Sequence, residues 1–139
     1  PGEEEKRGRL VDLGRRDMRE LAEVWLPPML APDRIADLSL VDDLTQMVIK
    51  AGPDVHERQI RALLSRPDAG TALPIITCPV LLMTGAQDGW SPEAQHREMA
   101  AMTSDSTVEI INDAGHFLPI EQPDRTAGTI QKWRSGLGD

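Results

Sequence analysis

The sequence predicts an α/β fold in which a helical segment precedes a βαβα unit with two parallel strands. Apolar residues recur at helical spacing throughout the first half, and prolines interrupt the pattern. The second half instead contains two short apolar runs, Val80–Thr84 and Thr107–Ile111, separated by a helical pattern that begins with a proline. We therefore expect a helical segment over residues 1–73 and an α/β segment over residues 74–139.

The N-terminal part predicts a polar stretch followed by one helix. Residues 1–14 are polar and contain glycine, so we expect them to be mobile. Residues 15–26 carry apolar side chains at helical spacing, and Pro27 ends the pattern. The stripe expected to face the core is Met18, Leu21, Ala22, Trp25 and Leu26.

Two further helices are expected between residues 39 and 67. Ser39 is the predicted N-cap of the first helix, and Gly52 ends it. Asp54 and Glu57 have the spacing of a capping box for the second helix, which ends at Pro67. The residues predicted to be buried are Leu40, Leu44, Met47, Val48 and Ala51 in the first helix, and Ile60, Leu63 and Leu64 in the second.

The second half of the chain predicts the order strand, helix, strand, helix. The continuous apolar run Val80–Thr84 is typical of a strand buried on both faces. Ser91 as N-cap and Pro92 at the first position begin the connecting helix. Thr107–Ile111 is the second strand, and Pro123 begins the last helix. The residues expected to face inward are Ala94, Met99 and Met102 in the connecting helix, and Ala127, Ile130 and Trp133 in the last helix.

Two titratable residues follow the two predicted strands. Asp88 lies four residues beyond Thr84, and His116 lies five residues beyond Ile111. A βαβ unit makes the strands parallel, and neighbouring strands run about 4.8 Å apart. Ligands of such sheets bind at the carboxyl ends of the strands. We therefore expect the carboxylate and the imidazole to meet at one edge of the sheet, within hydrogen-bond distance.

A paired carboxylate and imidazole can perform acid–base chemistry. The carboxylate holds one ring nitrogen in its protonated form, and the other nitrogen is left to accept a proton from a nucleophile. Taken singly, Asp88 is typical of a turn residue and His116 of an exposed loop residue; their joint placement favours a catalytic pair. A metal site formed by Asp88, His96 and His116 is a weaker alternative, because a polar residue on the connecting helix usually faces water. We expect no metal and no cofactor.

The sequence contains no evident nucleophile for this pair. None of its serines has the G-x-S-x-G setting of a strand-to-helix elbow. Ser91 is interpreted as a helix N-cap. Cys78 precedes the first strand, roughly 20 Å from Asp88 at about 3.3 Å per residue, so we interpret it as a core residue.

Composition and charge argue against several classes of partner. Fifteen Lys and Arg against 23 Asp and Glu give a net charge of −8, which is unfavourable for nucleic-acid binding. No apolar run is long enough for a transmembrane helix, so no membrane partner is expected. The single cysteine, Cys78, excludes an internal disulfide and favours a reducing, cytoplasmic location.

Two stretches of the sequence resemble a known family. I-T-C-P-V-L-L-M-T-G-A-Q-D-G-W-S-P (76–92) and D-A-G-H-F-L-P-I-E-Q-P-D (113–124) are similar to the C-terminal part of the α/β-hydrolase fold. Asp88 and His116 match the positions of the family's catalytic acid and histidine. The resemblance implies that residues 1–73 form a helical cap. It also implies that the nucleophile elbow and oxyanion loop lie in an N-terminal half that this chain, a fragment on this interpretation, lacks.

The resemblance implies a hydrolase that acts on small carboxylic esters through a nucleophile–His–acid triad, serine-type and carboxylesterase-like when complete. Trp90 and Phe117 are candidates to line the substrate pocket, although core packing explains them equally well. Expected partners are a small-molecule substrate and either the missing N-terminal half or a second copy, bound at the free edge of Val80–Thr84. The isolated chain is expected to be inactive.

Three alternatives remain open on the sequence alone. The same acid and histidine suit a haloalkane, epoxide or C–C bond hydrolase, in which the identity of the missing nucleophile differs. A non-catalytic small-molecule sensor could keep both residues. The chain could also be an inactive fragment.

Overall fold

The computed structural model describes residues 2–138, which fall into two compact units. Within these residues the helical unit comprises residues 2–27 and Ile35–Pro67, and the sheet unit comprises Pro28–Arg34 and residues 68–138. The sequence predicts two continuous segments that meet between residues 73 and 74. The structure instead groups residues 28–34 with the strands, because their backbone is hydrogen-bonded to the loop that follows the second strand.

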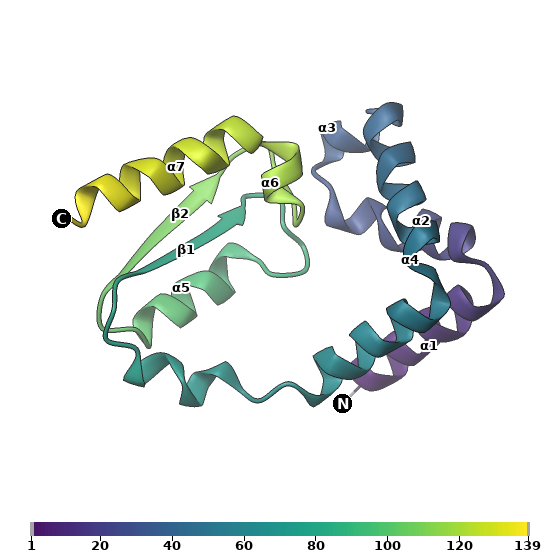
Figure 1. Cartoon of the computed structure of the whole chain (residues 1–139), viewed down its shortest axis with the longest axis horizontal. Helices are drawn as coiled ribbons and strands as arrows, with labels where there is room; N and C mark the ends of the chain where they lie inside the picture. The colour runs from purple at the N-terminus through teal and green to yellow at the C-terminus, as the bar shows by residue number, and fades with distance from the viewer. Residues whose placement is uncertain (1, 139) are drawn as a thin grey trace. The chain divides into compact units, whose positions relative to one another are not determined.

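The helical unit is built on helices α1 (Glu3–Arg16), α2 (Met18–Trp25) and α4 (Leu38–Ser65) (Figure 1). The prediction of a mobile stretch over residues 1–14 is wrong for residues 3–14, which belong to α1, and residue 1 lies outside the described residues. Acidic residues in its first turn and arginines in its last turn interact favourably with the helix dipole and stabilise the helix. Arg7 also forms an ion pair with Glu3, one turn away.

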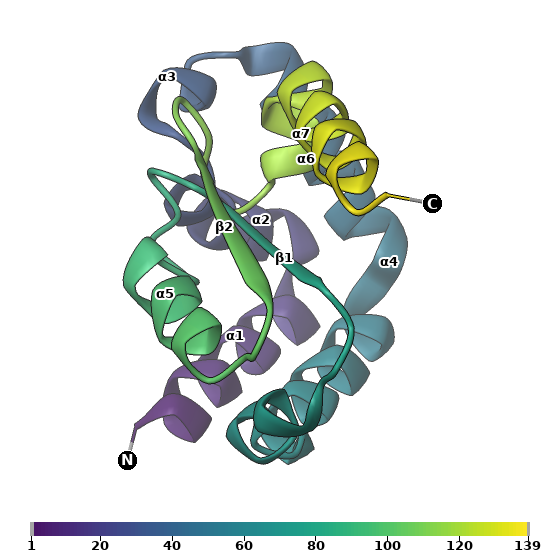
Figure 2. The same ribbon diagram turned by 90° about the vertical axis from the view of Figure 1, so that its left-hand side faces the viewer.

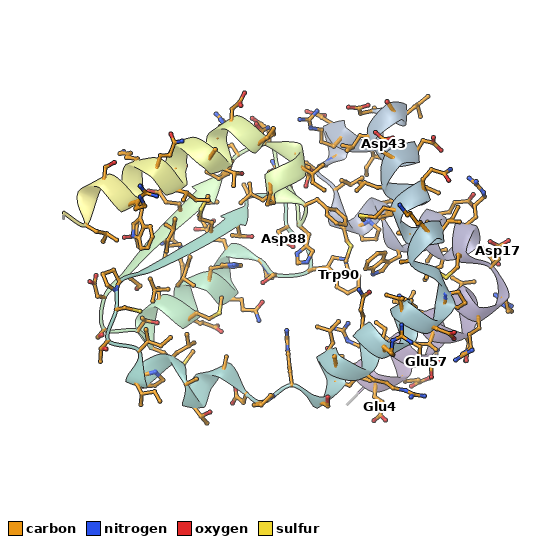
Figure 3. The ribbon with its side chains drawn as sticks, in the orientation of Figure 1. Glu4, Asp17, Asp43, Glu57, Asp88 and Trp90 are labelled. Carbon is orange, nitrogen blue, oxygen red and sulfur yellow. The ribbon has the colours of Figure 1, made fainter. Side chains whose placement is uncertain are left out.

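Helix α2 begins one residue after Asp17, which caps it. The Asp17 carboxylate accepts hydrogen bonds from the backbone N–H groups of Arg19 and Glu20, at 2.7 and 3.2 Å. Figure 3 labels Asp17 at this junction between α1 and α2. Leu21 and Ala22 are completely buried, as the helical stripe predicts.

Helix α4 begins earlier than the sequence suggests. Its N-cap is Asp37, whose carboxylate accepts from the Leu40 N–H at 3.1 Å, so the assignment of this role to Ser39 is wrong. Both residues are good caps, and the register of the helix selects the one that reaches a free N–H group. Gly52 adopts φ 76° and interrupts the helix where predicted.

The second half of α4 corrects two further predictions. Asp54 and Glu57 do not form a capping box, because Pro53 already lies inside the helix and Glu57 pairs with Arg15 and Arg61. Ile60 is buried, as expected. Four residues predicted to be buried are exposed: Met47, Ala51, Leu63 and Leu64.

The sheet unit is built on two parallel strands, in the predicted order. Strand β1 (Val80–Gly85) pairs with β2 (Ser106–Ile111), and Gly85 lies opposite Ile111. Helix α5 (Glu93–Ala101) connects the strands, and α7 (Pro123–Gly136) follows them. The two helices lie on opposite sides of the strand pair (Figures 1 and 2). Two short helices were not predicted: α3 (Pro32–Ile35) and α6 (Leu118–Glu121).

Burial in the sheet unit is lower than the sequence suggests. The first four residues of β1 are only half-buried, because the sheet in the described residues has two strands. A small core of Ile111, Ala114 and Leu118 lies at the carboxyl end of β2, against Met83. Four residues predicted to face inward are exposed instead: Ala94, Met102, Ala127 and Ile130.

Two local predictions in the sheet unit are also wrong. Ser91 does not cap α5, because Pro92 occupies the N-cap position and the Ser91 hydroxyl bonds to the Gln95 side chain at 3.0 Å. Cys78 is an exposed free thiol rather than a core residue. Between residues 2 and 138, no helix combines the length and the hydropathy that a membrane crossing requires.

Candidate active site

Asp88 and His116 meet at the carboxyl ends of the two strands. Asp88 follows β1 and His116 follows β2, and the parallel pairing brings both loops to the same edge of the sheet. His116 Nδ1 lies 2.9 Å from Asp88 Oδ2. Figure 3 shows Asp88 just beyond the end of β1, with its loop continuing to Trp90. The spatial relation that the sequence predicts is therefore present in the structure.

Local backbone geometry orients the Asp88 carboxylate. Its Oδ1 atom accepts hydrogen bonds from the N–H groups of Trp90 and Ser91, both at 2.8 Å. The Thr84 hydroxyl lies 3.2 Å from Oδ2, the oxygen that faces His116. The side chain is only 5% exposed, so the carboxylate is held by protein groups rather than by water.

The same contacts determine the charge on Asp88. Burial acts to raise the pKa of the carboxyl, but hydrogen bonds from Ser91, His116 and Trp90 outweigh it and hold that pKa below its ordinary value. Asp88 is therefore ionised at neutral pH and can only accept hydrogen bonds. It follows that the facing nitrogen of His116, Nδ1, carries a proton and donates it. The Nε2 atom of neutral His116 is then free to accept a proton.

Two glycines let the His116 loop lie close to other backbone segments. A Cβ atom on Gly85, at the end of β1, would lie 2.1 Å from the carbonyl oxygen of Ala114. A Cβ atom on Gly115 would lie 2.5 Å from the carbonyl oxygen of Met29 and 2.8 Å from the nitrogen of Ala31. Larger residues at either glycine would push His116 away from its position.

Backbone hydrogen bonds tie the two loops together. The Gln87 N–H donates to the Ala114 carbonyl at 2.9 Å, and the Ala114 N–H donates to the Gln87 side chain at 3.0 Å. The N–H of His116 itself donates to the carbonyl of Met29 at 2.7 Å. The backbone of His116 is thus held in place, while its side chain remains 39% exposed.

Trp90 and Phe117 lie next to the pair, but in different ways. The Phe117 ring meets the His116 ring edge to face, with centroids 6.3 Å apart at an interplanar angle of 72°. Trp90 contributes its backbone N–H to Asp88, and it is 37% exposed. Phe117 is therefore placed beside the imidazole, whereas Trp90 contacts the pair through its backbone N–H.

Sequence reasoning missed Glu121, which is completely buried beside the His116 loop. Its carboxylate accepts hydrogen bonds from three backbone N–H groups. The only sequence signal is an acidic residue at the end of the otherwise apolar stretch Leu118–Glu121. Such a signal does not distinguish a buried glutamate from an exposed one.

The metal alternative brings no such cluster together. Within residues 2–138, no group of three or more His, Cys, Asp and Glu side chains is arranged to hold a metal ion. His96 lies on α5, where its Nδ1 atom is 3.2 Å from the carbonyl oxygen of Pro92.

Comparisons with known proteins agree with this architecture. Residues 4–129 match the family model described as Alpha/beta hydrolase family. Among curated proteins, none matches the sequence.

Solved structures with similar folds include two esterases. A thermophilic esterase from Thermogutta terrifontis is 28% identical, with a TM-score of 0.89 over 100% of this chain and 52% of its own. An esterase from Exiguobacterium antarcticum is 18% identical, with a TM-score of 0.78 over 94% of this chain and 47% of its own. An alpha/beta hydrolase from a deep-sea metagenome of the Medee basin is 14% identical, with a TM-score of 0.80 over 97% and 51%. This chain thus spans about half the length of the solved proteins it resembles.

Proposed function

The chain belongs to the alpha/beta hydrolase family, and from this premise we propose that it supplies the acid and the base of a serine-type hydrolase acting on small carboxylic esters. The observation that carries the proposal is the 2.9 Å contact between His116 Nδ1 and Asp88 Oδ2 at the carboxyl ends of the strands. Similarity to the esterase from Thermogutta terrifontis supports esters as the substrate class.

His116 would act first as a base and then as an acid. Its Nε2 atom takes the proton of the nucleophilic hydroxyl as that oxygen attacks the ester carbonyl, and the same proton is then given to the departing alcohol. Loss of the alcohol leaves the acyl group bonded to the nucleophile. Water then attacks this acyl group while Nε2 takes its proton, and the proton returns to the nucleophile as the acid leaves. The net reaction is ester plus water to acid plus alcohol. Proton transfer of this kind typically contributes about 10²–10⁴-fold to the rate.

Asp88 would serve His116 in two ways. It holds the ring in the tautomer that leaves Nε2 unprotonated, and its negative charge stabilises the imidazolium that forms during the reaction. Its three hydrogen-bond partners besides His116 keep the carboxylate in place while the charge on the ring changes.

The nucleophile and the oxyanion donors would lie in a part of the fold that this chain does not contain. Support comes from the half-length match to the solved proteins. In this proposal the helical unit acts as the cap over the substrate, and Trp90 and Phe117 line the acyl pocket. A cytoplasmic location belongs to the same proposal and is supported by the single, unpaired Cys78.

The free edge of β1 would bind the rest of the fold. One edge of β1 pairs with β2, and the other has no strand partner among residues 2–138. Such an edge favours pairing with another strand, supplied by the N-terminal half or by a second copy of the chain. Size-exclusion chromatography of the isolated chain should show self-association, and a stable compact monomer would contradict this part of the proposal.

Substitution of His116 tests the catalytic role. In the complete protein, His116→Ala should lower the turnover of a p-nitrophenyl ester of a short-chain acid by about 10²–10⁴-fold. The matched control is His96→Ala, which removes a histidine from α5 and should leave turnover unchanged. Equal activity of both variants and the unmodified protein would overturn the proposal.

Labelling separates the proposed chemistry from its rivals. A fluorophosphonate reacts with an activated serine, so the complete protein should be labelled, and labelling should be lost in His116→Ala. Turnover of a haloalkane or an epoxide without labelling would indicate an aspartate nucleophile instead. Absence of any turnover with retained small-molecule binding would indicate a sensor.

A further inference from the structure

Glu121 is the most completely buried charged residue described, with 0% of its surface exposed. It ends the short helix α6, which begins two residues after His116. A buried carboxylate is costly unless hydrogen bonds replace its water. The hydrogen bonds of Glu121 must therefore replace the water that its carboxylate loses on burial.

The Glu121 carboxylate binds three backbone N–H groups from two segments. Oε1 accepts from Gly115 at 2.9 Å and from Phe117 at 3.1 Å, and Oε2 accepts from Ala31 at 2.8 Å. An ionised carboxylate only accepts hydrogen bonds, so its two oxygens suit a set of donors with no acceptor among them. The Arg34 guanidinium donates to the backbone carbonyl of the same Glu121.

These contacts hold the backbone on both sides of His116. Glu121 accepts hydrogen bonds from the N–H groups of Gly115 and Phe117, which precede and follow His116. The N–H of His116 itself donates to the Met29 carbonyl at 2.7 Å. Met29 belongs to the segment that Glu121 also binds, through Ala31. All three N–H groups of residues 115–117 are therefore bound, two by the Glu121 carboxylate and one by the Met29 carbonyl.

We propose that Glu121 is a positioning residue for His116, which couples the His116 loop to the segment 28–34 and keeps the imidazole in register with Asp88. The catalytic consequence of this inference rests on the proposed function, but its structural content does not. Glu121 does not touch the Asp88–His116 pair directly; it acts through the backbone on either side of the histidine.

The segment 28–34 gives this coupling a wider role. Along the chain it lies between α2 and α4, so both of its ends continue into the helical unit. Glu121 holds that segment at Ala31, and the close approach of Gly115 leaves no space between the two backbones. A displacement of residues 28–34 would therefore be transmitted to His116 through the shared carboxylate.

Two substitutions at position 121 separate positioning from simple burial. Glu121→Gln keeps the size of the side chain but replaces one acceptor oxygen by an N–H₂ donor, so at least one N–H group of the backbone would face another donor. Glu121→Leu removes all acceptors. The matched control is Glu98→Gln, which makes the same chemical change at an exposed position on α5.

The experiment uses two readouts on the complete protein. One is steady-state hydrolysis of a p-nitrophenyl ester, with kcat and KM determined separately. The other is nitrogen-edited NMR of the histidine rings, in which the Nδ1 proton of His116 reports its bond to Asp88. The ring signal that is lost in His116→Ala is assigned to His116.

Positioning predicts a specific pattern. Glu121→Gln should remain folded, lower kcat by about 10²-fold with KM changed less than threefold, and shift or broaden the Nδ1 proton signal of His116. Glu98→Gln should leave both readouts unchanged. Unaltered kcat and an unaltered His116 signal in Glu121→Gln would overturn the proposal, whether or not Glu121→Leu folds.

The two proposals fail in different ways. If the unmodified protein hydrolyses no ester, the proposed function fails, and the NMR signal still decides whether Glu121 positions His116. If ester turnover is high and lost in His116→Ala but unchanged in Glu121→Gln, the function stands and the positioning role is rejected.

Discussion

The helical unit and the sheet unit each contain a histidine in a defined environment, and the two environments differ in exposure and in the partners of the ring nitrogens. His56 in α4 is 6% exposed, packs edge-on against Trp25 with ring centroids 6.1 Å apart, and has no hydrogen-bond partner at Nε2 within the part of the chain described. His116 has a carboxylate at Nδ1 and a 39% exposed side chain.

The two imidazole rings have different electrostatic surroundings. Burial lowers the pKa of His56, and a hydrogen bond with the backbone of Leu10 only partly opposes this effect. The site therefore disfavours the imidazolium. The ring of His116 instead faces the ionised carboxylate of Asp88 at Nδ1. The comparison teaches that neighbours, rather than residue type, separate a structural histidine from a candidate catalytic one.

The largest effect is expected from breaking the carboxylate side of the His116 site. Asp88→Asn in the complete protein should lower kcat for ester hydrolysis by roughly 10³–10⁴-fold, because the amide can donate to Nδ1 and favour the wrong tautomer. Steady-state kinetics measure this. Asp124→Asn changes an exposed carboxylate on α7 and should be neutral. A loss of less than tenfold in Asp88→Asn would remove the distinction between the two histidines.

A smaller effect is expected from crowding the His116 loop. Gly115→Ala should reduce the free energy of unfolding by about 1–3 kcal/mol, because the new methyl group overlaps the backbone of Met29 and Ala31. Urea denaturation measures the change. Gly128→Ala in α7 is the control, since nothing lies within 4 Å of its Cβ position, and it should be neutral or stabilising by about 0.5–1 kcal/mol. Equal behaviour of the two variants would show that the loop can relax.

In the helical unit, the corresponding local test is the cap of α4. Asp37→Ala should cost about 1 kcal/mol of unfolding free energy, because the Leu40 N–H loses its acceptor. Ser39→Ala, one residue inside the helix, should change stability by less than about 0.5 kcal/mol. Urea denaturation of both variants gives the comparison, and a larger loss in Ser39→Ala would favour the cap that the sequence suggested.

The smallest effect is expected from the titration of His56. Its folded-state pKa lies below the ordinary value of 6.5, so the unfolded chain takes up the proton first as the pH falls. Stability should therefore be independent of His56 well above pH 6.5 and should decrease as the pH falls below it. The pH dependence of urea denaturation should be shallower in His56→Leu than in the unmodified chain, with His96→Leu as control. Identical pH slopes in His56→Leu and the unmodified chain would contradict the proposed difference between the sites.

The sequence alone determined the features that depend on short stretches of chain. Alternation of apolar runs and turn residues located both strands within one residue at each end. Parallel pairing then followed from the intervening helix, and with it the meeting of Asp88 and His116. The edge of a parallel sheet is a geometric consequence of its topology, so this relation needed no knowledge of side-chain packing.

Choices between nearby residues were decided by the tertiary structure. Asp37 and Ser39 are both suitable caps, and Cys78 and Leu63 are both apolar enough for a core. Their roles depend on which neighbours reach them, and both Cys78 and Leu63 are exposed in the described part of the chain. Such outcomes are differences of about 1 kcal/mol between alternatives, which local patterns do not resolve.

The environment of His116 shows the limit most clearly. The sequence identified the histidine, its carboxylate partner and the glycine before it. Only the tertiary structure placed residues 28–34 against that glycine and turned Glu121 inward to bind three N–H groups. The bond between the Ala31 N–H and the Glu121 carboxylate joins residues that are 90 positions apart. Hydrogen bonds over such separations depend on the packing of whole elements, and no local pattern of residues records that packing.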